Sequence, residues 1–144
     1  MSRRIVLMTL LLVLVVALAA CGSDDGGDSA REAAAPTTFE TIDVQTAHNQ
    51  ICENDQAVFV DVRNPDETVG GYPAGAILIP LPEFAQRAPQ ELTDKNAAIY
   101  VICNSGNRSA VASQTLIDLG YTHVYNVDGG IQAWRAASLP ESRP

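Results

Sequence analysis

The chain has 144 residues, 47% of them hydrophobic, and its 17 acidic and 9 basic side chains give a formal net charge of −8 at pH 7. This acidic balance argues against a nucleic-acid partner, and the three cysteines and two histidines lack the spacing of a zinc site. The sequence therefore indicates neither nucleic acid nor a metal ion as a ligand.

The first twenty residues have the pattern of an export signal. A cationic start precedes an almost wholly apolar run over residues 5–20, which is too short to be a comfortable membrane span. The run ends in Leu18-Ala19-Ala20-Cys21, which resembles the bacterial lipobox. We therefore expect residues 1–20 to be a lipoprotein signal peptide. Cys21 would then carry a lipid anchor on the extracytoplasmic side of a membrane, periplasmic or at the cell surface.

Two other interpretations of this segment stay open. One is a plain secretory signal followed by an incidental cysteine. The other is export by the twin-arginine route, which Arg3 and Arg4 faintly suggest, although the very apolar run favours the general secretory route.

Residues 21–38 are acidic and rich in glycine and alanine. They contain no large apolar side chain, so we expect a flexible tether. Removal of the signal takes away Arg3 and Arg4, so the net charge of −8 becomes −10 in the mature chain. The remaining stretch, residues 39–140, is long enough for one domain with its own core.

The domain begins with a predicted helix over residues 43–53. Its apolar side chains recur at helical spacing, and the aspartate at its first position is placed to cap it. We expect Cys52 to be a buried spectator on this helix, on the face of Val44 and Ile51. The alternative is a regulatory disulfide between Cys52 and Cys103, which an oxidising envelope would permit.

Short apolar runs rich in β-branched residues predict strands. The clearest covers residues 97–102 and ends directly before Cys103, and another covers residues 57–62. Apolar strands that alternate with helices imply an α/β domain with a mainly parallel sheet. The other predicted elements are a loop at 70–75, a small strand at 76–79, short helical turns at 80–87 and 89–92, a helix from 107 or 108 to 119, a strand at 123–127 and a short helix at 129–135.

The loop of residues 103–109 carries the candidate chemistry. Cys103 follows a parallel strand, where such sheets bind their ligands. The small polar residues after it let the backbone curl with its N–H groups inward, and the next helix adds its positive N-terminal end. These donors should lower the pKa of the thiol. Gly106 permits the tight curvature, and Arg108 supplies the only full positive charge in the loop. The alternative is that Cys103 is an inert core thiol.

This loop resembles the active-site loop of single-domain rhodaneses, the thiosulfate sulfurtransferase family. Three further segments resemble the family in the right order, and together the four cover residues from about 40 to 137. One departure is Tyr72, which stands where the family often has a histidine. The matching segments are Cys103-Asn104-Ser105-Gly106-Asn107-Arg108-Ser109-Ala110, Val60-Asp61-Val62-Arg63-Asn64-Pro65-Asp66-Glu67, Gly71-Tyr72-Pro73-Ala74-Gly75-Ala76 followed by Ile79-Pro80-Leu81, and Val127-Asp128-Gly129-Gly130-Ile131-Gln132-Ala133-Trp134.

The resemblance implies an α/β fold with a central parallel sheet of about five strands flanked by helices. It also implies a sulfurtransferase in which Cys103 takes a sulfane sulfur, as a persulfide, from a small anionic donor such as thiosulfate or polysulfide. The sulfur would pass to a thiol or cyanide-like acceptor. No cofactor or metal is implied, and we expect a monomer. The residues expected to bind the donor and the persulfide are Asn104, Ser105, Gly106, Asn107, Arg108 and Ser109.

Asp61 and Arg63 are expected to support the site. They would brace the catalytic loop, or they would form an ion pair or cap that only supports the turn with Glu67. Trp134 and Tyr100 are expected in the core.

Two rival functions are weighed against sulfur transfer. Phosphatases and arsenate reductases of this fold resemble Cys-x5-Arg, whereas Cys103 and Arg108 form the shorter Cys-x4-Arg, which fits a sulfur better than a phosphate. Non-catalytic rhodanese-like modules typically lack the cysteine that this chain keeps. The physiological donor stays open, and weak thiosulfate binding is one alternative, because Asn104 occupies a position that is often basic in thiosulfate enzymes.

Overall fold

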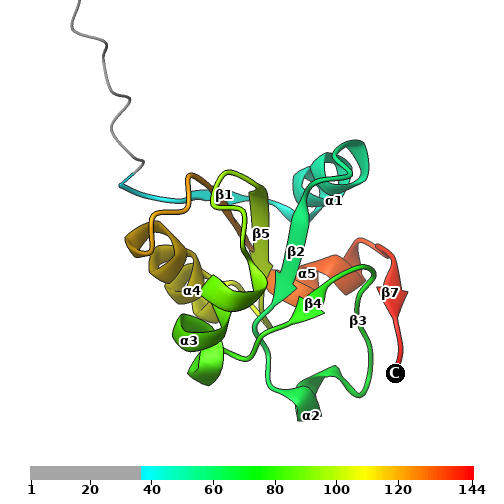
Figure 1. Cartoon of the computed structure of the whole chain (residues 1–144). Coiled ribbons are helices and arrows are strands. Elements are labelled where there is room, and N and C mark those ends of the chain that lie inside the picture. Colours follow the sequence, from blue (N-terminus) through cyan, green and yellow to red (C-terminus); the bar gives the residue numbers. More distant parts are fainter. Residues whose placement is uncertain (1–36) are drawn as a thin grey trace, which may run out of the picture. The chain divides into compact units, whose positions relative to one another are not determined.

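The computed structural model describes residues 37–144, whose main sheet has five parallel strands in the order β1-β6-β5-β2-β4 (Figure 1). The expected α/β fold with a central parallel sheet of about five strands is confirmed. The predicted signal peptide, Cys21 and most of the predicted tether fall within residues 1–36, outside the described residues. The five strands are β1 (Glu40–Ile42), β2 (Val58–Asp61), β4 (Ile77–Leu78), β5 (Ala98–Ile102) and β6 (His123–Val127).

Helices cover both faces of this sheet. In Figure 1, α3 and α4 lie on one side of the strands and α1 and α5 on the other, and two separate clusters of buried apolar residues fill these layers. The helices at the positions of α1, α4 and α5 are confirmed to within a residue or two. The helices are α1 (Val44–Glu53), α2 (Pro65–Thr68), α3 (Leu81–Glu91), α4 (Asn107–Asp118) and α5 (Gly130–Ala136).

The residues of β5 alternate between the two layers, as the pleat of a strand requires. Ile99 and Val101 belong to the core beneath α3 and α4, whereas Tyr100 and Ile102 belong to the core beneath α1 and α5. Cys103 continues the alternation and joins the α3/α4 core, with only 1% of its surface exposed. The alternation of side chains along β5 therefore directs the candidate nucleophile, Cys103, toward the layer that contains α4.

Trp134 and Tyr100 lie in the opposite layer, buried as predicted. The Trp134 ring packs on Phe59 at 5.2 Å between centroids and meets the His48 ring edge-on at 5.6 Å. Its Nε1 donates a hydrogen bond to the Pro140 carbonyl at 2.9 Å. These rings fill the layer away from the candidate nucleophile, and His48 serves as a packing residue.

The prediction that Cys52 is buried is wrong, because its side chain is exposed. A helix turns by about 100° per residue, so Ile51 lies about 20° from Val44 around the axis while Cys52 lies about 80° away. Val44 is buried and Ile51 is partly buried against the core, as that geometry requires. Cys52 lies at the edge of the apolar face of the helix. Its four-residue spacing from His48 is typical of residues on one face, but its angle from Val44 places it outside the buried part of that face.

The two short helical turns predicted on either side of residue 88 are also wrong, because α3 runs without a break. Phe84 and Ala88 are one turn apart and both are buried against the core, so packing fixes this face of the helix. Pro89 lacks the N–H of one helical bond, and this local loss is offset by that packing. Leu92 closes the helix by donating its N–H to the Ala88 carbonyl at 2.8 Å.

Three short strands were not predicted. One is β1, at the edge of the main sheet, and the others are β3 (Tyr72–Pro73) and β7 (Glu141–Ser142), which pair antiparallel in a separate two-stranded sheet. Strands of two or three residues are too short to show a period in the sequence. The pairing of β3 with β7 ties the end of the chain to the loop of residues 70–75.

Within residues 37–144, no helix is long and apolar enough to cross a membrane. The same residues hold no cluster of three or more histidine, cysteine or carboxylate side chains suited to a metal ion.

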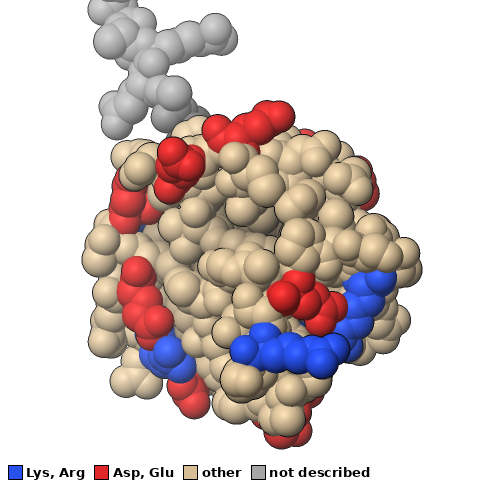
Figure 2. Space-filling model, turned by 90° about the vertical axis from the view of Figure 1, so that its right-hand side faces the viewer, with Lys and Arg blue, Asp and Glu red and all other residues tan. Residues whose placement is uncertain are grey.

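Figure 2 shows the side of the molecule that lies at the right of Figure 1, where basic and acidic side chains lie against one another on a mostly uncharged surface. Ion pairs such as Arg135 with Glu141, at 2.8 Å, neutralise charge locally.

Candidate active site

Cys103 is held at the carboxyl end of β5 by the first turn of α5. Its carbonyl accepts the N–H of Ile131 at 2.8 Å, and the Asn104 carbonyl accepts that of Gln132 at 3.3 Å. Gly130 makes this approach possible, because a Cβ there would lie 2.5 Å from the Cys103 oxygen. The position of the nucleophile therefore depends on the last helix as well as on its own strand.

The Cys103 sulfur lies in a cradle of hydrogen-bond donors. The N–H of Gly106 donates to Sγ at 3.1 Å, and the hydroxyl of Ser109 lies 3.4 Å from it. Gly106 adopts a left-handed conformation, with φ at +100°, which brings its N–H back toward the sulfur before α4 begins. The loop curls as the sequence suggested, and glycine is the residue that this conformation favours.

The pKa of the Cys103 thiol lies below its ordinary value. Burial, the largest single influence, acts to raise it, but the combined hydrogen bonds act in the opposite direction and prevail. They come from the Ser109 hydroxyl and from the backbone N–H groups of Ser109, Ser105 and Gly106. Such donors stabilise the thiolate, which is the nucleophilic form of cysteine.

Ser109 is the meeting point of several buried groups. Besides Sγ, its Oγ contacts the Gly106 carbonyl at 3.0 Å and the Asn126 side-chain oxygen at 2.6 Å. Asn126 is buried on β6, 17 residues farther along the chain, and was not among the predicted site residues. A polar residue inside an apolar strand was the available signal. The hydroxyl has one hydrogen, so the Asn126 oxygen and the Gly106 carbonyl compete with the sulfur for it.

Arg108 forms a two-point ion pair with Glu67. Its two terminal nitrogens donate to the two carboxylate oxygens at 2.7 and 2.6 Å. Hydrogen bonds from Arg108 are the main reason that the pKa of Glu67 falls to about 2, while burial opposes the shift. Both side chains are about one third exposed, at 32% and 31%. No local pattern in the sequence predicts the pairing of Glu67 with Arg108, which lies 41 residues away.

Asp61 and Arg63 form a second ion pair, buried at 1% and 2% exposure. Arg63 also donates to the carbonyls of Glu67 and Gly71, each at 3.1 Å. Within residues 37–144 neither side chain hydrogen-bonds to the loop of residues 103–109. The geometry corresponds to the turn-supporting alternative, and the link to the loop passes through Glu67.

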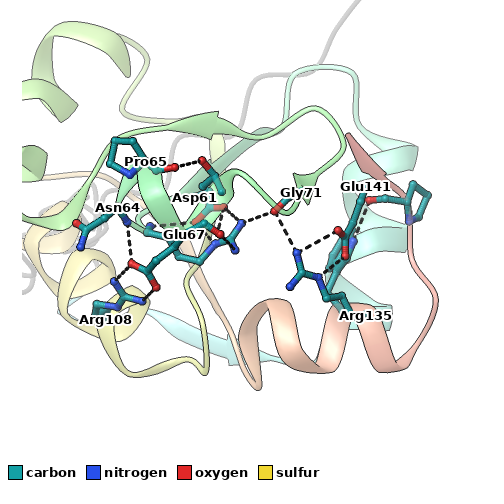
Figure 3. A network of polar contacts seen from close by, with 12 residues as sticks. Asp61, Asn64, Pro65, Glu67, Gly71, Arg108, Arg135 and Glu141 are labelled. Atoms are coloured by element: carbon teal, nitrogen blue, oxygen red, sulfur yellow. Dashed lines mark hydrogen bonds and ion pairs between the residues drawn. The ribbon is translucent and has the colours of Figure 1, made fainter. Parts of the chain in front are cut away.

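These contacts join into one network, shown in Figure 3. It runs from Arg108 to Glu67, from there to the Asp61–Arg63 pair, and on to the Gly71 carbonyl. That carbonyl also accepts from Arg135, which pairs with Glu141. The network connects the start of α4 with the segment that follows β2 and with the end of the chain.

The remaining predicted binding residues differ in how they face the sulfur. Gly106 and Ser109 are buried beside it, whereas the side chains of Ser105 and Asn107 are exposed and that of Asn104 is partly exposed. The loop therefore contributes backbone groups more than side chains.

A separate hollow of about 310 Å³ lies beside the Asp61–Arg63 pair. None of residues 103–109 lines it, so it is not where the thiol chemistry is placed. Its lining residues are Asp61, Thr68, Tyr72, Ala76 and Leu78.

Known proteins resemble this chain over the domain just described. The family model of the rhodanese-like domain matches residues 43–137. YqhL of Bacillus subtilis, an uncharacterized protein, is 42% identical over 79 residues, which are 55% of this chain and 61% of that relative. This chain thus spans less than two thirds of that relative.

Two further similarities concern an enzyme and a solved structure. The thiosulfate sulfurtransferase PspE of Escherichia coli is 41% identical over 71 residues, which are 49% of this chain and 68% of that relative. The crystal structure of a rhodanese-related protein from Thermoplasma volcanium matches with a TM-score of 0.63 and 32% identity, over 74% of this chain and 100% of that one.

Proposed function

Since this chain belongs to the rhodanese-like domain family, whose members similar to it include a sulfurtransferase, we propose that it transfers sulfane sulfur through a persulfide on Cys103. The observation that carries the proposal is the environment of Sγ. It lies at the carboxyl end of β5, receives the Gly106 N–H at 3.1 Å, and belongs to a thiol whose pKa is lowered. An inert core thiol has no need of inward-facing amides.

The first half of the reaction loads the sulfur. The Cys103 thiolate attacks the outer sulfur of thiosulfate, the bond between the two donor sulfurs breaks, and sulfite leaves with the electron pair. The product, Cys103–S–S⁻, keeps one negative charge at its terminal sulfur. We expect the amides of Ser105, Gly106 and Ser109, which favour the thiolate, to stabilise this charge as well.

The second half unloads the sulfur. A thiolate or cyanide attacks the terminal sulfur of the persulfide, and the Cys103 thiolate leaves, ready for another cycle. Both halves exchange one sulfur–sulfur bond for another bond to sulfur, so the cycle balances with no metal or organic cofactor. We expect none to be required.

Thiocyanate production from thiosulfate and cyanide tests the proposal. The full chain should turn over, and Cys103→Ser should lose all activity while remaining folded. Absence of transfer with thiosulfate, polysulfide and alkyl persulfide alike would favour a non-catalytic binding module. Hydrolysis of a generic phosphate ester in place of sulfur transfer would favour the phosphatase alternative.

The site of action is a separate proposal that rests on the sequence of residues 1–38. We propose that Cys21 bears a lipid that anchors a monomeric domain on the extracytoplasmic side of a membrane. A fatty-acid analogue should label the wild-type chain in bacterial cells and should not label Cys21→Ala. Label that persists in this variant would contradict the anchor.

A further inference from the structure

The positive charge of Arg108, at the start of α4, is already balanced by a carboxylate in the absence of a donor. Glu67 takes one N–H from each terminal nitrogen of Arg108, at 2.7 and 2.6 Å, and leaves the pair with no net charge. Among residues 37–144, Nε of Arg108 has no hydrogen-bond partner, so an anion can still approach one edge of the group. It meets a dipole rather than a full positive charge.

A second carboxylate lies against the same loop. Asp128, in the turn before α5, is exposed, and within residues 37–144 its side chain has no hydrogen bond or ion pair. A Cβ on Gly106 would lie 3.3 Å from its Oδ1, so this oxygen is close to the residue whose N–H faces the sulfur. The loop therefore has one arginine, paired with Glu67, and a second carboxylate, Asp128, beside Gly106.

This charge arrangement discriminates between donors of different charge. With thiosulfate, the attacking thiolate and the donor together bring three negative charges into the cradle. With an alkyl persulfide anion they bring two. Like charges a few ångströms apart repel strongly where water is partly excluded, and the cost rises with each added charge. The loop amides supply partial positive charge to either donor, but only an uncompensated arginine would offset the additional charge of thiosulfate.

We propose that Glu67 sets the donor specificity of the site, biasing it toward singly charged organic persulfides and away from dianionic donors. The inference rests on the proposed sulfur transfer and names its substrate class. In the favoured reaction, the Cys103 thiolate attacks the terminal sulfur of R–S–S⁻. The sulfur–sulfur bond of the donor breaks, R–S⁻ leaves with the electron pair, and Cys103–S–S⁻ forms. Glu67 acts through Arg108, so it is a positioning residue.

Glu67→Gln tests this inference with little disturbance of the fold. Gln keeps an oxygen for the Asn64 N–H, which Glu67 accepts at 3.0 Å at the start of α2, and it can still accept from Arg108. The negative charge is removed together with one acceptor, because the amide nitrogen replaces the carboxylate oxygen that accepts from the second terminal nitrogen of Arg108. The readout is the ratio of kcat/KM for thiosulfate to kcat/KM for 2-hydroxyethyl persulfide, whose only charge is that of the persulfide anion, measured on the full chain. This ratio should rise about tenfold in Glu67→Gln.

Glu83→Gln is the matched control. It removes the same charge from another arginine–glutamate pair, since Glu83 accepts from Arg87 at 2.9 Å on the exposed side of α3. Its ratio should equal that of the wild-type chain. Asp128→Asn should raise the ratio by a smaller factor, and added salt should move the wild-type ratio toward that of Glu67→Gln, because salt screens exposed charges.

A ratio unchanged in Glu67→Gln, or a fall in both rates by the same factor, would overturn the inference, because Glu67 would then only orient the loop. These outcomes differ from failure of the proposed function. In that case the wild-type chain would form no Cys103 persulfide with either donor.

Discussion

The molecule contains two arginine–carboxylate pairs that are joined in one network and differ in burial. Asp61 and Arg63 are 1% and 2% exposed, and Arg63 is fixed further by two backbone carbonyls. Arg108 and Glu67 are about one third exposed, and the arginine is held by a single carboxylate. The buried pair fixes the backbone of the segment after β2. Within residues 37–144, Arg108 makes no such contact with a backbone carbonyl, which is consistent with its proposed role in binding the donor.

Breaking the buried pair should have the largest effect. Asp61→Asn leaves the guanidinium of Arg63 buried without its counter-charge, so we expect a loss of about 3–5 kcal/mol in the free energy of unfolding. Urea unfolding monitored by fluorescence of Trp134 measures it. Glu67→Gln is the comparison from the exposed pair and should lose less than about 1 kcal/mol. Similar losses of unfolding free energy in the two variants would show that burial does not make the Asp61–Arg63 pair more important for stability than the Arg108–Glu67 pair.

Removing the exposed arginine should instead affect catalysis. Arg108→Ala takes away the positive charge and leaves Glu67 facing the donor, so kcat/KM for thiosulfate should fall roughly 10- to 100-fold, about 1.4–2.7 kcal/mol. Arg108→Lys should recover part of the loss, because a point charge does not reproduce the two-point geometry.

The double variant Arg108→Ala/Glu67→Gln sharpens this test. It should be more active with thiosulfate than Arg108→Ala alone, since the repelling carboxylate is gone. An equal loss for all donors in Arg108→Ala would mean that the residue organises the loop and does not select the donor.

The exposed pair should also give a small pH dependence of stability. The pKa of Glu67 falls from 4.5 to about 2 on folding, so its contribution is complete above pH 4.5 and is lost as the pH falls through about 2. Because the pair is partly exposed, the expected size is below about 1 kcal/mol. Unfolding curves between these two pH values should show a shallower decline in Glu67→Gln than in the wild-type chain. Parallel declines would show that the pair adds nothing to stability.

The smallest effect on stability is expected for a substitution of Cys52. The two described cysteines differ in burial, as the two ion pairs do. Cys52 is exposed on α1, whereas Cys103 is buried in the α3/α4 core on the other side of the sheet. Cys52→Ala should therefore change the free energy of unfolding by less than about 0.5 kcal/mol and leave turnover intact. Loss of redox-sensitive activity in this variant would instead support a disulfide with Cys103.

The sequence predicted the part of the site that is local in the chain. The strand at residues 97–102, the glycine at position 106 and the start of the next helix together define the cradle, because backbone hydrogen bonds between near neighbours follow from these residue types. The face of β5 that carries Cys103 follows from strand alternation alone.

Contacts between distant segments were not predictable in the same way. The pairing of Glu67 with Arg108 and of Asn126 with Ser109 depends on which strand ends the fold brings together. The short strands β1, β3 and β7 form by pairing with neighbours that no local pattern indicates. For Cys52, helical spacing predicted a place near the core, whereas the structure shows an exposed side chain at the edge of the apolar face.

The most direct test of the central claim is the mass of the intact protein after incubation with a sulfane donor. We expect the wild-type chain to gain one sulfur atom on the peptide that contains Cys103, and to lose it when cyanide is added. Cys52→Ala should gain the same mass, and Cys103→Ser should gain none. A chain that gains no sulfur from any donor, or gains it on Cys52, would contradict the account.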